Sequence, residues 1–254
     1  MQISVHYRLV LALSGLGAAA SLALLPMTFA LHGNLAGQPP WPALAAVAAL
    51  QALVVFALAA HFGLRSAARV GLPGAPLLAA LAGGRPVPLG NARLGQAAAA
   101  GTGTGLLVLA ADVLFFHGVL PPSAAALGDI ALWKRLLAGI LYGGVAEEIL
   151  LRLFLVSGLV YLIARGWREG VRARGVPVAI AILVAALVFG LGHLPATAAL
   201  GPLTPAIIAR ALLLNGLVGI VCGVLYARRG LEAAMAAHAA AHIPLQIAPM
   251  LLAP

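Results

Sequence analysis

Long apolar runs recur along the whole chain, and several exceed the roughly 20 residues that a helix needs to cross a bilayer. Hydrophobic residues occupy 63% of the 254 positions and charged residues 8%. The runs are continuous rather than alternating with a period of two, which favours helices over the strands of a barrel. We therefore predict an all-α, polytopic transmembrane helical bundle with no separate soluble domain.

The apolar runs predict about seven spans joined by short loops. We expect them at residues 7–31, 42–64, 96–116, 134–163, 177–199, 204–227 and 231–252. The segment 65–93 is rich in Pro and Gly, and its apolar run is too short to cross a membrane, so we predict a connector there. Four glycines near the later spans are expected to permit close helix approach, namely Gly143, Gly144, Gly190 and Gly192.

Basic residues set the expected orientation. The net charge is +9, but Arg and Lys are spread over several short loops rather than gathered on one face, which argues against a nucleic-acid partner. Most of them flank the predicted spans on one side, and the positive-inside rule makes that side cytoplasmic. The N-terminus is then predicted inside and the C-terminus outside. The single cysteine, Cys222, excludes an intrachain disulfide and a cysteine-based metal cluster.

Two adjacent acids, Glu147 and Glu148, lie within the fourth apolar run and are two of only six acidic residues in the chain. A charge in the hydrocarbon region costs several kcal/mol, so such residues face a cavity or a partner and mark a functional site. Glu148 and Arg152 are four residues apart and share a helix face, whereas adjacent residues point about 100° apart. We therefore predict a Glu148–Arg152 pair and leave Glu147 as a candidate general base. Alternatively, both acids only fasten helices together through Arg152.

Three histidines lie in later spans at comparable depths. At about 1.5 Å per residue, Glu147 lies ~27 Å from the cytoplasmic end of its span, His193 ~28 Å and His242 ~20 Å. His238 and His242 are four residues apart, on one helix face. A single buried histidine is more often a core residue than a catalytic one. Three of them near a buried carboxylate predict one intramembrane site.

Three motifs occur here in an order and spacing that resemble the CPBP intramembrane proteases, which include the type II CAAX prenyl endopeptidases and bacterial abortive-infection proteins. They are EEILLR at 147–152, FGLGH at 189–193 and GVLYARRGLEAAMAAHAAAH at 223–242. The resemblance covers about the last 120 residues. It implies a catalytic helical core at 96–254, preceded by variable spans and the cytoplasmic connector at 1–95.

The resemblance also implies an intramembrane endopeptidase acting on a membrane-associated or CAAX-like peptide or protein that enters from the membrane or the cytoplasm. Glu147 would activate water with the help of His193, and His238 and His242 would stabilise the oxyanion. Glu148, Arg152 and Phe189 would support these groups.

One position departs from the family. The family usually has Asn or Asp where this chain has His242, and an imidazole can also donate a hydrogen bond to an oxyanion. The substitution keeps a zinc alternative open, with His193, His238, His242 and Glu147 as ligands. We favour the metal-free, glutamate-type mechanism, which needs no cofactor.

The resemblance and the Ala, Arg and Gly bias indicate an integral protein of a bacterial inner membrane. A non-proteolytic scaffold or immunity protein and a proton-coupled carrier are the alternative functions. Two further polar residues have less specific expectations. Asp112 is expected to be a helix-end charge or to line the cavity, and Asn215 to hydrogen-bond a neighbouring helix.

Overall fold

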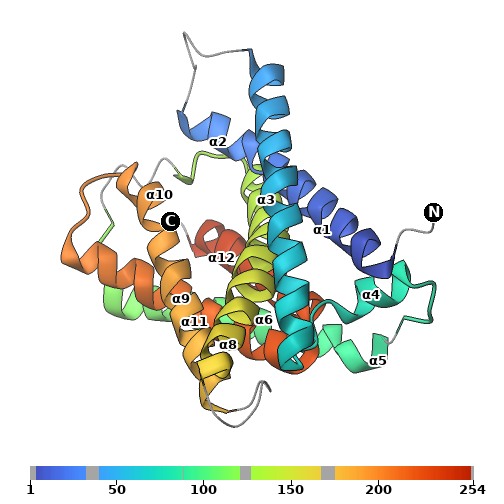
Figure 1. The fold of residues 1–254 in the computed structure, drawn as a ribbon. Helices are drawn as coiled ribbons and strands as arrows, with labels where there is room; N and C mark the ends of the chain where they lie inside the picture. The colour runs from blue at the N-terminus through green and yellow to red at the C-terminus, as the bar shows by residue number, and fades with distance from the viewer. Residues whose placement is uncertain (1–3, 33–39, 88, 121–126, 167–174, 253–254) are drawn as a thin grey trace.

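The computed structural model describes residues 4–32, 40–87, 89–120, 127–166 and 175–252, and these ranges contain helices and turns but no strand (Figure 1). The all-α prediction is confirmed. The helices are α1 (Val5–Leu22), α2 (Leu25–His32), α3 (Trp41–Val70), α4 (Pro76–Ala82), α5 (Leu89–Ala92), α6 (Leu94–Phe116), α7 (Leu132–Leu137), η2 (Ala138–Glu147), η3 (Ile149–Val156), α8 (Ser157–Gly166), α9 (Val176–Gly192), α10 (Leu194–Ala198), α11 (Pro205–Arg229) and α12 (Leu231–Leu252).

Among the described residues, six helical segments are long and apolar enough to cross a membrane: Val5–Ala30, Trp41–Val70, Leu94–Phe116, Leu132–Gly166, Val176–Ala198 and Pro205–Arg229. They correspond to the first six predicted spans. The predicted seventh span forms α12, which is not one of the six. Its two histidines, Glu232 and Gln246 make it more polar than the others. The protein is therefore an integral membrane protein with at least six candidate spans.

Helix α12 lies inside the bundle, where it packs on α6, α11 and η2 (Figure 1). Small residues permit this approach. A Cβ at Gly101 or Gly105 of α6 would collide with carbonyl oxygens of α12. A Cβ at Gly144 would lie 2.8 Å from the Cβ of Ala239. With so little space between backbones, α12 is held tightly on two sides.

The predicted glycine contacts are mostly present. Gly143 and Gly144 both pack against α12, and a Cβ at Gly190 would lie 2.9 Å from the Cα of Leu212 on α11. Gly192 is the exception, because a Cβ there would meet no atom within 4 Å. It lies at the end of α9, where its exposed position leaves open space.

The fourth span is not a regular α-helix, contrary to prediction. It begins as α7, continues as the π-helical segments η2 and η3 around the two glutamates, and ends as α8. A π-helix has i to i+5 hydrogen bonds and a wider turn than an α-helix, and such winding is common at functional sites. Each residue therefore rotates the chain by less than the 100° assumed from the sequence.

The connector between α3 and α6 is docked onto the helical core. The Leu78 N–H of α4 donates a 2.9 Å hydrogen bond to Glu232 Oε1, and the Leu231 N–H donates a 2.8 Å bond to the Gly74 carbonyl. Gly230 has φ of 99°, and a Cβ there would collide with Pro76. The connector thus holds the start of α12, the helix that carries His238 and His242.

Candidate active site

Glu148 lies fully buried between two cationic or proton-donating groups. Its Oε2 is 3.2 Å from Arg152 Nε, which confirms the predicted pairing, and its Oε1 accepts a 2.7 Å hydrogen bond from His238 Nδ1. Arg152 is also fully buried, and its guanidinium carbon lies 5.4 Å from the centre of the Phe189 ring. The ion pair with Glu148 and the aromatic face of Phe189 stabilise this buried guanidinium.

Glu147 approaches the same histidine from the other side. Its Oε2 lies 3.8 Å from His238 Nε2, and its side chain retains 17% exposure. The expectation that the two adjacent glutamates cannot face one point was therefore wrong. The wider π turn brings neighbouring residues closer in direction, and one imidazole presents its two nitrogens to the two carboxylates. Glu148 orients His238, and Glu147 is the accessible acid of the pair.

The two histidines of α12 share one helix face, as their spacing predicts, and their rings stack on one another. Their ring centres are 5.2 Å apart with an angle of 14° between the planes. The glycine face of η2 makes room for them, because a Cβ at Gly143 would lie 2.7 Å from His242 Nε2 and one at Gly139 2.6 Å from His242 Nδ1. His242 Nδ1 is buried and makes no hydrogen bond to the described residues. It is therefore free to bond a water or a substrate group.

A small cavity of about 40 Å³ lies beside the two rings, lined among others by His238, His242 and Asn215. A water needs roughly 10–15 Å³ and two or more polar partners, and this cavity offers both. Asn215 was expected to bond a neighbouring helix, but its amide donates a 2.8 Å hydrogen bond to the Ala211 carbonyl of its own helix. Its position beside the histidines was not foreseen, because a lone Asn in an apolar run gives no signal of the face on which it lies.

His193 is the C-cap residue of α9 and comes from a different helix than His238 and His242. Its Nδ1 is 2.8 Å from the Phe189 carbonyl oxygen, and a carbonyl only accepts, so Nδ1 carries the donated proton. In the neutral ring this leaves Nε2 as a proton acceptor. Among the described residues it makes no hydrogen bond or ion pair with Glu147, His238 or His242. The Phe189 ring contacts both imidazoles edge to face, with its centre 4.7 Å from that of His193 and 5.5 Å from that of His238.

The described part of the chain contains one group of three potential metal ligands whose ligand atoms all lie within 4.8 Å of one another: Glu148, Cys222 and His238. Only His238 of this group belongs to the zinc set predicted from the sequence. Glu148 already contacts Arg152 and His238 Nδ1–H through its two oxygens. Cys222 was missed as a neighbour of the site, because a cysteine in an apolar helix reads as a small core residue.

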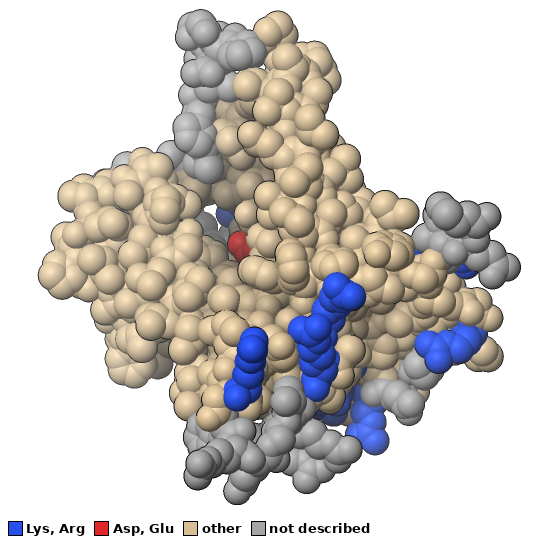
Figure 2. Space-filling model, viewed as in Figure 1, with Lys and Arg blue, Asp and Glu red and all other residues tan. Residues whose placement is uncertain are grey.

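One face of the molecule is hollowed, and the site residues differ in exposure. Figure 2 shows an opening between the helices with an acidic side chain at its base. Of the two glutamates, Glu147 is half-buried and Glu148 is completely buried. His193, at the end of α9, is half-buried as well. Water and a peptide therefore have their nearest access on the side of Glu147 and His193.

Six bilayer-length apolar helices around a buried cluster of glutamates, histidines and an arginine define an integral membrane protein with an ionisable intramembrane site. Residues 129–243 match the family described as type II CAAX prenyl endopeptidase Rce1-like. For this stretch of the chain, the match confirms the resemblance found in its motifs. The match runs from before α7 into α12 and includes every predicted site residue. Neither the curated proteins nor the solved structures include a significant match to the chain.

Proposed function

We propose that this CAAX-type intramembrane endopeptidase hydrolyses a peptide bond of a membrane-associated or CAAX-like substrate with Glu147 as the general base. The proposal rests on the difference between the two glutamates in exposure and in bonding partners. Glu148 is fully buried and bonded to Arg152 and His238, whereas Glu147 is partly exposed and lies against His238 Nε2. Only Glu147 has both access to water and a carboxylate oxygen free to take a proton.

In the proposed reaction, Glu147 removes a proton from a water while the water oxygen attacks the scissile carbonyl. His193, with Nε2 as an acceptor, helps to orient that water. The carbonyl oxygen gains negative charge as the tetrahedral intermediate forms, and an N–H of His242 stabilises it. His238 can add a second donor only as an imidazolium, which keeps Nδ1–H on Glu148 and donates Nε2–H to the oxyanion. Glu147 then returns the proton to the leaving amine as the C–N bond breaks. Glu148 and Arg152 hold the His238 ring in place.

We favour this glutamate-type mechanism over a zinc enzyme. The compact group of potential ligand atoms contains Glu148 and Cys222 rather than Glu147, His193 and His242. A zinc site would need three or four ligand atoms about 2.0–2.3 Å from a common point. Metal analysis of the purified protein, with activity measured before and after chelation, tests the choice. Stoichiometric zinc together with loss of activity on its removal would overturn the glutamate-type version.

Glu147→Gln tests the catalytic role directly. The purified chain in proteoliposomes, with a prenylated CAAX-type reporter peptide as probe, should lose about 10²–10⁴-fold in kcat, the usual contribution of a general base. Glu232→Gln is the matched control, because a Gln there can still accept the Leu78 N–H bond and the residue lies outside the site. We expect the control to retain normal kcat.

The same variant separates the alternatives. Full biological activity of Glu147→Gln at a normal protein level would favour a non-proteolytic scaffold or immunity protein. Proton-coupled transport in proteoliposomes without peptide cleavage would favour a carrier. The proposed location is a bacterial inner membrane, where the abortive-infection relatives suggested by the motifs would also act. No nucleic-acid partner is proposed.

A further inference from the structure

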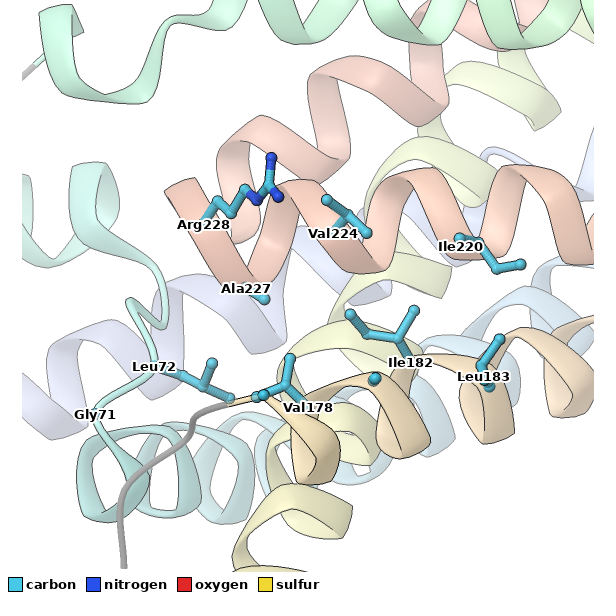
Figure 3. A pocket seen from close by; sticks show the side chains of 11 residues that line it. Gly71, Leu72, Val178, Ile182, Leu183, Ile220, Val224, Ala227 and Arg228 are labelled. Atoms are coloured by element: carbon cyan, nitrogen blue, oxygen red, sulfur yellow. The ribbon is translucent and has the colours of Figure 1, made fainter.

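A second cavity lies away from the active site, at the arginine-rich end of the bundle (Figure 3). It has a volume of about 470 Å³, within the roughly 300–1,000 Å³ typical of small-molecule sites. Its walls are apolar side chains of α9 and α11, among them Val178, Ile182, Ile220 and Val224. The turn after α3 closes one end. We call this cavity the α9–α11 groove.

Among the described residues that line the groove, Arg228 in the last turn of α11 is the charged one (Figure 3). Arg228 is exposed and makes no hydrogen bond or ion pair with any described residue. Two arginines at the same end of the bundle are engaged: Arg229 bonds Gln96 Oε1 at 3.2 Å, and Arg69 bonds Tyr161 Oη at 3.2 Å. Arg228 therefore has unengaged donors on a residue that lines the groove, and Figure 3 shows its side chain extended from α11 on the side away from α9.

The helix ends define where the groove lies across the membrane. Helix α9 begins at Val176 and α11 ends at Arg229, so the groove lies along the first turns of one and the last turns of the other. Lys and Arg side chains gather at this end of the molecule on the face seen in Figure 2. By the positive-inside rule this end meets the cytoplasmic leaflet, whose lipid surface is negatively charged.

We propose that the α9–α11 groove binds an anionic phospholipid of the cytoplasmic leaflet, with one acyl chain in the groove and the phosphate paired with Arg228. The apolar walls match an acyl chain, and the guanidinium matches a phosphate through its fork of N–H donors. Basic pockets between transmembrane helices on the cytoplasmic side bind anionic headgroups for this reason. The site is independent of peptide hydrolysis and holds whether or not Glu147 is the catalytic base.

The test is native mass spectrometry of the full chain in detergent, titrated separately with phosphatidylglycerol and phosphatidylcholine. We expect one tightly bound phosphatidylglycerol and weaker binding of phosphatidylcholine. Arg228→Gln should weaken phosphatidylglycerol binding about fivefold, the effect of one cation near a lipid surface, and reduce the difference between the lipids. Arg165→Gln, an exposed arginine at the same end that does not line the groove, is the matched control and should bind normally.

A second variant tests the apolar part. Ala179 lines the groove and is exposed, so Ala179→Phe fills the space while keeping the chain apolar and folded. Binding of both lipids at the tight site should fall. Equal weakening by Arg165→Gln and Arg228→Gln would mean a diffuse charge effect and would overturn the proposal. Wild-type lipid binding by Ala179→Phe would also overturn it, as would a dimer that this variant dissociates, because the groove would then bind a second copy.

Discussion

Gly143 provides the sharpest test of the site's geometry. A Cβ at this position would lie 2.7 Å from His242 Nε2, 3.3 Å from His242 Cδ2 and 3.4 Å from His238 Nε2. Ordinary van der Waals contact begins near 3.4 Å, so Gly143→Ala forces the His242 ring to move by about 0.7 Å. The stacked His238 ring lies next to it, and both proposed oxyanion donors are displaced.

The size of this displacement sets the expected loss of activity. A misplacement of about 1 Å at a catalytic group costs about 10²-fold, so Gly143→Ala should lower kcat by roughly 10- to 100-fold. Overpacking beside a buried helix costs about 1–3 kcal/mol of unfolding free energy. Gly158→Ala is the matched control, because it lies in the same span and a Cβ there meets no atom within 4 Å. A helical alanine in place of glycine stabilises by up to about 1 kcal/mol, so the control should be active and slightly more stable.

Two assays together decide the outcome. Cleavage of the reporter peptide in proteoliposomes gives kcat. A thiol-reactive dye follows unfolding, because Cys222 is the single cysteine of the chain and is 1% exposed in the folded state. If Gly143→Ala cleaves and unfolds like the wild type, the imidazoles do not lie against this glycine, and the description of the oxyanion donors is refuted.

Three further variants test ion pairs and helix packing with the same thiol assay. Arg152→Met leaves Glu148 without its cation and should lower the free energy of unfolding by about 3–5 kcal/mol. The double variant with Glu148→Gln should lose less than the sum of the two single losses. Strictly additive losses would argue against a coupled pair. Asp112→Asn removes the carboxylate that accepts a 2.6 Å hydrogen bond from Arg210 Nε. It should lower the free energy of unfolding by about 1–3 kcal/mol. An unchanged unfolding midpoint would show that this ion pair has no effect on stability. Gly101→Ala should destabilise by about 1–3 kcal/mol because its Cβ meets the backbone of α12, and a gain in stability would contradict the close packing.

The sequence was sufficient for the features that depend on local spacing. Continuous apolar runs predicted helices because the backbone must bond internally in a bilayer. The Glu148–Arg152 pair followed from residues four apart, and the structure confirms it. The shared helix face of His238 and His242 followed from the same rule, and the structure adds that their rings stack.

Other features depend on distances between helices and on winding, which a sequence does not specify. The π-helical segments were missed because the prediction assumed regular α winding, and this produced the wrong expectation that Glu147 and Glu148 diverge. Asn215 and Cys222 were not placed beside the histidines, because their positions depend on how α11 rotates against α12. Asp112 lies near the end of α6, in agreement with the helix-end expectation, and the sequence did not indicate its half-exposed partner Arg210 on α11.

The tight glycine packing around α12 gives the two sides of the site different freedom to move. Helix α12 forms one wall of the site and is tightly held. Gly101 and Gly105 of α6 contact it on one side, and Gly144 of η2 contacts it on the other. The opposite wall ends at Gly192 and His193, where the helix terminates and open space surrounds the last glycine. We expect a bulky polypeptide to be admitted by displacement of the end of α9, while the histidines of α12 stay fixed as the reference against which the peptide bond is aligned.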